Sequence, residues 1–218
     1  MPRLLFEKTG NAVWISHLDL MRLFQRAFKR AGLPLTHTQG FNPRPSVSIA
    51  LPLSVGVESV CELLDFDLDS VDVACDDIME RLNLALVEGI RVLVVYENGS
   101  KIKNLALLRS IVTMEYDAGV PEGAGESLRQ LFARDALTVE KRGKNGVTEQ
   151  DIIPMIRTVT VHEEPRVVRL ELLACCQNPT LNPMQLVAAV ERYLPELKPD
   201  HAKCRRVELY DVNETVFR

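Results

Sequence analysis

The spacing of hydrophobic residues near the start of the chain predicts a short strand followed by a well-defined helix. Apolar residues dominate 3–8, which favours a strand, and a turn containing glycine follows. Ser16 and Asp19, three residues apart, form a capping-box-like pair that predicts the start of a helix. Gly32, followed by Leu33 and Pro34, ends this helix. Apolar residues at helical spacing predict one buried stripe: Leu20, Phe24, Ala27, Phe28 and Ala31.

Three further strands are predicted in the rest of the first hundred residues. A loop rich in turn-forming residues, 36–45, precedes strands at 46–53 and 58–67. The turn at 54–56 joins these two strands as an antiparallel pair. A strongly apolar run at 90–96 predicts the last strand of this half.

A second helix lies between the last two of these strands. Asp69 or Ser70 is its predicted cap, and Gly89 ends it. Its predicted buried stripe is Val71, Ala74, Cys75, Ile78, Leu82 and Ala85. The resulting order, β-α-β-β-α-β, is the ferredoxin-like arrangement, in which two helices cover one face of an antiparallel sheet.

The second half of the chain predicts a looser copy of the same unit with one extra strand. We therefore expect an α+β protein of two tandem ferredoxin-like lobes, 1–98 and 104–218, with the junction at 98–103. The predicted elements are strands at 110–117, 137–142, 156–162, 167–175 and 205–212, with helices at 125–133 and 182–194.

Composition places the chain among ordinary globular proteins. It has 218 residues, of which 46% are hydrophobic and 26% charged, and this excludes disorder and fibres. No apolar run approaches the roughly 20 residues that a membrane-spanning helix needs, and the first residues lack a signal-peptide core. We expect a cytoplasmic protein. Its five cysteines form no C-x-x-C pair, so we expect free and mostly buried thiols rather than disulfides or a zinc site.

Positive charge is concentrated at the start of the chain, although the net charge is −4. Residues 1–60 carry seven basic and three acidic side chains, whereas 61–150 carry ten basic and seventeen acidic ones. This asymmetry predicts one surface that attracts anions. On the first helix, Arg22, Arg26 and Lys29 share one side, with Arg30 beside them. These side chains suit phosphate groups, since guanidinium groups bind oxyanions through two hydrogen bonds. A solvated helix face is the alternative explanation.

The loop that follows the helix carries further candidate binding groups. Pro43 and Pro45 fix the backbone on both sides of Arg44, so this guanidinium has little freedom to lose on binding. Phe41 is a candidate stacking platform for an unpaired base. The candidate contacts to a nucleotide are His37, Gln39, Phe41 and Asn42.

Catalysis has little support in the sequence. His17 and His37 are the only candidates for a general base, and both also suit a structural or surface role. The chain has no P-loop, no dinucleotide-binding glycine motif, no H-E-x-x-H and no G-x-S-x-G. We therefore expect no cofactor and no metal site.

Four sequence segments resemble one known family, the radical-SAM-associated proteins of bacteria, whose domain is uncharacterised. The resemblance is strong over 3–66 and extends to most of the chain. It implies the free-standing form of a domain that occurs beside, or fused behind, a cobalamin-binding radical SAM protein, and it implies that protein as a partner. The segments are Ile15-Ser16-His17-Leu18-Asp19-Leu20-Met21-Arg22, Ala31-Gly32-Leu33-Pro34, Gln39-Gly40-Phe41-Asn42-Pro43-Arg44-Pro45 and Ala50-Leu51-Pro52-Leu53-Ser54-Val55-Gly56-Val57-Glu58-Ser59.

These observations leave three functional hypotheses. The first is a non-catalytic accessory module that binds tRNA or rRNA through the basic patch and presents it to a separate radical SAM enzyme. The second is a protein-interaction subunit that docks this enzyme without RNA. The third is a metal-independent ribonuclease that uses His17 or His37.

Overall fold

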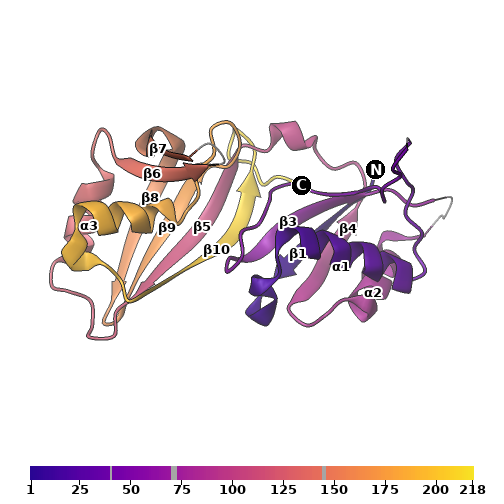
Figure 1. Ribbon diagram of the computed structural model, residues 1–218, viewed down its shortest axis with the longest axis horizontal. Coiled ribbons are helices and arrows are strands. Elements are labelled where there is room, and N and C mark those ends of the chain that lie inside the picture. Colours follow the sequence, from indigo (N-terminus) through magenta and orange to yellow (C-terminus); the bar gives the residue numbers. More distant parts are fainter. Residues whose placement is uncertain (40, 70–72, 144–145) are drawn as a thin grey trace. The chain divides into compact units, whose positions relative to one another are not determined.

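The protein combines strands and helices, and a computed structural model describes them for residues 1–39, 41–69, 73–143 and 146–218 (Figure 1). The described residues form four α-helices and antiparallel strand pairs, so the architecture is mixed α+β, as expected. Contacts between residues divide the chain into two units, 1–102 together with Arg218, and 103–217. Each unit is described by itself below.

The first unit has two helices and four strands in the order β-α-β-β-α-β. Its strands pair antiparallel in the order β4-β1-β3-β2. A short 3-10 helix, η1 (Gly10–Trp14), connects the first strand to the first helix. The other elements are β1 (Arg3–Lys8), α1 (His17–Arg30), β2 (Val47–Ile49), β3 (Glu58–Phe66), α2 (Cys75–Ala85) and β4 (Ile90–Tyr96).

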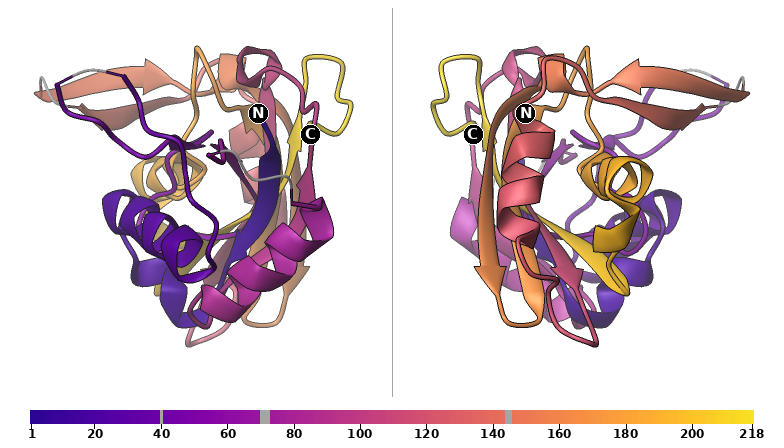
Figure 2. Two further views of the ribbon diagram at one scale, coloured as in Figure 1. Left: turned by 90° about the vertical axis from the view of Figure 1, so that its right-hand side faces the viewer. Right: turned by 90° about the vertical axis from the view of Figure 1, so that its left-hand side faces the viewer.

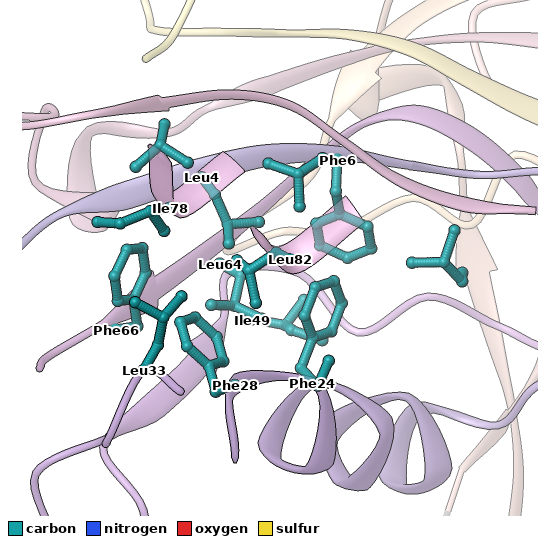
Figure 3. Packing of buried hydrophobic residues seen from close by; sticks show 14 of the residues in the cluster. Leu4, Phe6, Phe24, Phe28, Leu33, Ile49, Leu64, Phe66, Ile78 and Leu82 are labelled. Atoms are coloured by element: carbon teal, nitrogen blue, oxygen red, sulfur yellow. The ribbon is translucent and has the colours of Figure 1, made fainter. Parts of the chain in front are cut away.

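The core of the first unit lies between its two helices and one face of its sheet (Figure 3). Helix α1 buries four members of the predicted stripe, Leu20, Phe24, Ala27 and Phe28. The Phe24 ring packs edge-on against Phe6 of β1, with 4.8 Å between ring centroids. This packing fixes which side of α1 faces the core, so its charged residues lie on the solvent side.

A buried lysine positions the start of α1. The side chain of Lys8 is fully buried, and its Nζ donates to the carbonyls of Val13 at 3.0 Å and Ile15 at 2.8 Å. A buried ammonium is tolerated where hydrogen bonds replace its water. These two bonds tie the segment before α1 to the end of β1. Ser16 then caps the helix as predicted, since its side chain accepts a hydrogen bond from the Asp19 amide.

Two predicted elements of this unit differ from the structure. The strand expected at 46–53 is only three residues long. Leu51 and Leu53 are buried, but they lie outside any strand. Asp69 does not cap the second helix, which begins at Cys75 with Ala74 in the N-cap position and no side-chain cap. The carboxylates of Asp76 and Asp77 lie in its first turn instead. Their negative charge interacts favourably with the positive end of the helix dipole there. Ser70 and Val71 lie outside the described residues.

The second unit repeats the same pairing scheme with an insertion. Its main strands pair antiparallel in the order β10-β5-β9-β8. A separate hairpin of β6 and β7 stands between α3 and β8, and Figure 2 shows it as a long two-stranded ribbon. The elements are β5 (Leu107–Glu115), α3 (Ala124–Phe132), β6 (Thr138–Gly143), β7 (Gly146–Asp151), β8 (Ile156–Glu164), β9 (Val167–Cys175), α4 (Gln185–Tyr193) and β10 (His201–Tyr210).

The extra strand expected in this unit is therefore one half of a hairpin whose other half was not predicted. The sequence of β7 is almost entirely polar and exposed, so it lacks the alternation that marks a half-buried strand. The last helix begins at Gln185, later than the predicted 182, because Asn182 forms a turn in which its side chain accepts from the Met184 amide. Among the described residues, no helix is long and apolar enough to cross a membrane.

We expect the native protein to expose only two of its five thiols to a thiol reagent at about pH 8. Cys75 and Cys175 are half-buried, whereas Cys61, Cys176 and Cys204 are buried. Burial raises the pKa of Cys176 to about 12 and that of Cys204 to about 11, so both stay protonated and unreactive. Timed labelling followed by mass spectrometry measures this, with urea-unfolded protein as the control in which all five react. Fast labelling of Cys176 or Cys204 in the native protein would contradict the prediction.

Candidate nucleic-acid interface in the first unit

The basic residues of α1 do not share one environment. Nη1 of Arg22 lies 3.0 Å from Oδ1 of Asp19, and both side chains are exposed. Hydrogen bonds from Ser16 and then from Arg22 lower the pKa of Asp19. Nη2 of Arg30 donates to the carbonyl of Ala85 at 2.5 Å, at the end of α2. Arg30 is therefore held against the second helix rather than with the other cations.

Three cations of α1 and the loop after it are free to bind an external anion. Arg26, Lys29 and Arg44 are exposed, and no carboxylate among the described residues forms an ion pair with them. An exposed guanidinium or ammonium exchanges its water for a phosphate at little desolvation cost. We call Arg26, Lys29 and Arg44 the basic patch.

The loop after α1 is closed at its base like a small hairpin. The amide of Ser46 donates to the carbonyl of Thr36 at 2.8 Å, and the amide of Thr38 donates to the carbonyl of Arg44 at 2.9 Å. The Arg44 amide also donates to Oγ1 of Thr38 at 3.0 Å. His37 and Pro45 form an isolated antiparallel bridge between these contacts. We call the segment 36–46 the arm, and these backbone contacts join its two ends, 36–38 and 44–46.

The arm ends in an exposed aromatic ring. Phe41 has a relative exposure of 110%, and Gln39 and Asn42 are exposed on either side of it. At this exposure the ring does not pack in the core, so its faces are accessible to an external partner. Gly40, between Gln39 and Phe41, lies outside the described residues.

A pocket of about 430 Å³ lies where the end of α1 meets the base of the arm. Lys29 comes from the helix and His37 from the arm, so the pocket brings two of the predicted site residues together. Its apolar wall includes Phe28, Leu33 and Leu35. We call this cavity the α1 pocket.

The two candidate catalytic histidines lie at opposite ends of α1. His17 is the first residue of the helix, whereas His37 lines the α1 pocket beside Lys29. A rise of 1.5 Å per residue places the backbones of His17 and Lys29 about 18 Å apart along the helix axis. One substrate hydroxyl is too small to be reached from both ends, so the arrangement does not form a histidine pair. Within the described residues, no group of three or more His, Cys, Asp or Glu is placed to hold a metal ion.

The sequence model of a bacterial family matches residues 2–183 of the chain. The family is described as "uncharacterized protein conserved in bacteria (DUF2344)". The chain belongs to this family. The match covers 2–102 of the first unit, including α1 and the arm. No curated protein matches the sequence.

Solved structures add a likeness in fold. A chain of the "Crystal Structure of a Cbf5-Nop10-Gar1 Complex" has a TM-score of 0.50 and 11% identity, over 95% of this chain and 48% of that one. A chain of the "archaeal box H/ACA sRNP Nop10-Cbf5 complex" has a TM-score of 0.42 and 10% identity, over 94% of this chain and 46% of that one. An unknown protein from Galdieria sulphuraria has a TM-score of 0.26 and 14% identity, over 94% of this chain and 97% of that one. This chain thus spans about half the length of the first two chains, and the first likeness shows fold alone.

Sequence reasoning missed most of the walls of the α1 pocket. Gln25, Phe28, Leu33 and Leu35 line it, and none was a candidate. The available signal was the helical spacing of Gln25 and Lys29, which places both side chains on one face near Gly32, where the chain turns back. Phe28 was expected only as a core residue and Leu33 only as a helix-end residue. The sequence pattern of a core residue is the same whether or not that residue also lines a cavity.

Three cations on the open sheet face of the second unit are paired with carboxylates. Arg109 lies 3.6 Å from Glu171, and Lys203 lies 2.6 Å from Glu115. Arg169 pairs with Glu164. These pairs neutralise the cations locally, so the first unit is the better candidate for an anion site.

Proposed function

We propose that this member of the family is a non-catalytic accessory module that binds single-stranded RNA through its first unit. The carrying observation is that Lys29 and His37 line one pocket at the base of the arm, whose tip presents Phe41. The basic patch supplies charge for phosphates, and the arm supplies an aromatic face for an unstacked base. An unpaired segment of tRNA or rRNA has both features.

Single-stranded RNA suits this site better than a duplex. The net charge of −4 counts against a broad basic surface, so we place the footprint at the basic patch. A protruding aromatic ring is useful only where bases are unstacked. A site of this limited size suits an RNA loop or a single-stranded RNA end.

We also propose that both units are ferredoxin-like lobes, with boundaries at 1–98 and 104–218. The strand orders β4-β1-β3-β2 and β10-β5-β9-β8, each antiparallel and each built from β-α-β-β-α-β, support this assignment. In the second unit the β6–β7 hairpin is the insertion. The partner implied by the sequence resemblance, a cobalamin-binding radical SAM protein, would act on the RNA that this chain presents.

Filter binding of a single-stranded RNA oligonucleotide at two salt concentrations tests the RNA proposal. The variant Arg26→Ala/Arg44→Ala removes two exposed cations of the basic patch. We expect its affinity at low salt to fall about tenfold, since two exposed charge contacts contribute about 1.4 kcal/mol together. Its log–log salt slope should become shallower by about 1.4, because each phosphate contact to a single strand contributes about 0.7.

The matched control is Arg81→Ala/Arg91→Ala, which removes two exposed cations from α2 and β4 of the same unit. This control should retain the wild-type affinity and slope. Equal losses in both double variants, or no salt-sensitive retention by the wild type, would overturn the proposal. Nuclease-resistant co-purification with the radical SAM enzyme, without RNA retention, would instead support a protein-docking subunit. RNA cleavage lost in His17→Ala/His37→Ala would support the ribonuclease.

A further inference from the structure

We infer that the α1 pocket takes one nucleoside monophosphate, which RNA supplies as an unstacked nucleotide. The base would lie on the apolar wall, and its phosphate would lie at Lys29. This inference rests on the proposed function and gives its site a specific occupant.

The pocket has the size and polarity that a nucleotide requires. Its volume of about 430 Å³ is within the range of small-molecule sites. Pro34, Leu35 and Pro45 give the pocket an apolar wall that suits the face of a flat ring, whereas Phe28 and Leu33 are fully buried. A nucleobase is apolar on its faces and polar at its edges, so it needs a wall of this kind with polar groups at the rim.

The rim carries three polar side chains of complementary chemistry. Gln25 has both a donor and an acceptor, which suits the hydrogen-bonding edge of a base. Lys29 supplies the charge for a phosphate, and His37 supplies a ring nitrogen on the side of the arm. In the described part of the chain, these three side chains form no hydrogen bond or ion pair, so their polar groups are available to a ligand.

The walls of the pocket are formed before any ligand binds. Helix α1 ends in a Schellman motif, in which the amide of Leu33 donates to the Phe28 carbonyl at 3.0 Å and the amide of Gly32 donates to the Lys29 carbonyl at 3.3 Å. Gly32 adopts the left-handed φ of +67° that this motif requires. The Pro34 carbonyl accepts from the Asp69 amide at 2.8 Å, which anchors the next segment. A preformed pocket loses little conformational entropy on binding, which favours a small ligand.

Titration calorimetry of the full chain with the four nucleoside 5′-monophosphates tests the inference. At least one of them should bind ten or more times more tightly than ribose 5-phosphate or inorganic phosphate, because only the nucleotide has a ring for the apolar wall. Equal binding of inorganic phosphate and all four nucleotides would overturn the inference.

Two variants of α1 locate the ligand. Lys29→Gln removes the rim cation and should weaken nucleotide binding about tenfold, as expected for a charge-assisted hydrogen bond. Arg22→Gln removes the same charge two helical turns away and should leave the affinity unchanged. Both positions are exposed, so both variants should keep the wild-type circular dichroism spectrum. Equal effects of the two variants would overturn the assignment to this pocket.

A measurement of RNA binding separates this inference from the proposed function. Gln25→Trp should fill the pocket and abolish mononucleotide binding while leaving the basic patch in place. RNA retention that depends on Arg26 and Arg44 but is unchanged by Gln25→Trp, without nucleotide binding, overturns the pocket inference and leaves the proposed function standing. Nucleotide binding without RNA retention overturns the proposed function and identifies the free nucleotide as the source of the ligand.

Discussion

Replacing Phe24 with alanine is expected to lower the free energy of unfolding of the first unit by about 4 kcal/mol. The ring is fully buried in the middle of α1 and packs edge-on against Phe6, with 67° between the ring planes. Truncation removes this aromatic contact and leaves a cavity that the sheet and helix backbones cannot close. Urea unfolding followed by circular dichroism measures the loss.

Phe41→Ala is the matched control, since it truncates the same side chain at a fully exposed position in the same unit. This variant should stay within about 0.5 kcal/mol of the wild type. The pair also separates two positions of phenylalanine, because Phe24 packs in the core whereas Phe41 is the exposed ring that we propose for RNA binding. Equal unfolding midpoints for the two variants would show that α1 is not held by the core described above.

Local signals explain why α1 could be predicted nearly residue by residue. Ser16, the stripe that includes Phe24, and Gly32 each act through neighbours within one or two turns of the helix. The strands β1 and β4 were also predicted, because apolar residues mark both segments. In such elements the residues that the pattern marks as buried are also the ones that pack in the core, so a prediction from the pattern is confirmed.

Elements without such signals were missed or misplaced. The hairpin strand β7 has polar residues on both faces, and helix α2 begins at Cys75 without any capping side chain. Both depend on backbone pairing or on packing elsewhere in their unit. A prediction from hydrophobic periodicity has no access to either cause.

The candidate site shows the same division. Its residue types were found from charge, proline and aromatic patterns, whereas their grouping depends on contacts distant in sequence. Arg30 is held by the Ala85 carbonyl, 55 residues away, and this contact removes it from the basic patch. His37 reaches Lys29 only because the arm folds back and closes at its base. The candidate residues Lys29 and His37 thus line one pocket, together with Gln25, only in the folded chain.

Gly89→Ala is expected to destabilise the first unit by about 3 kcal/mol. Gly89 lies in the turn before β4 with a φ of +84°, a conformation that disfavours any side chain. An added Cβ would collide with the Thr9 carbonyl oxygen and lie 2.8 Å from the Cβ of Ala12. The backbone cannot retreat freely, because the Gly89 carbonyl accepts a hydrogen bond from the Thr9 amide at 2.8 Å.

Gly10→Ala separates backbone strain from the collision. Gly10 also has a positive φ, +54°, and it follows Thr9 directly, but an added Cβ there meets nothing within 4 Å. Its replacement should therefore lower the free energy of unfolding by only about 1 kcal/mol, the contribution of the left-handed conformation alone. The excess loss in Gly89→Ala measures how tightly the turn before β4 packs on the segment that leads into α1. Equal losses in the two variants, measured by urea unfolding, would show that this contact yields and that the start of α1 does not depend on it.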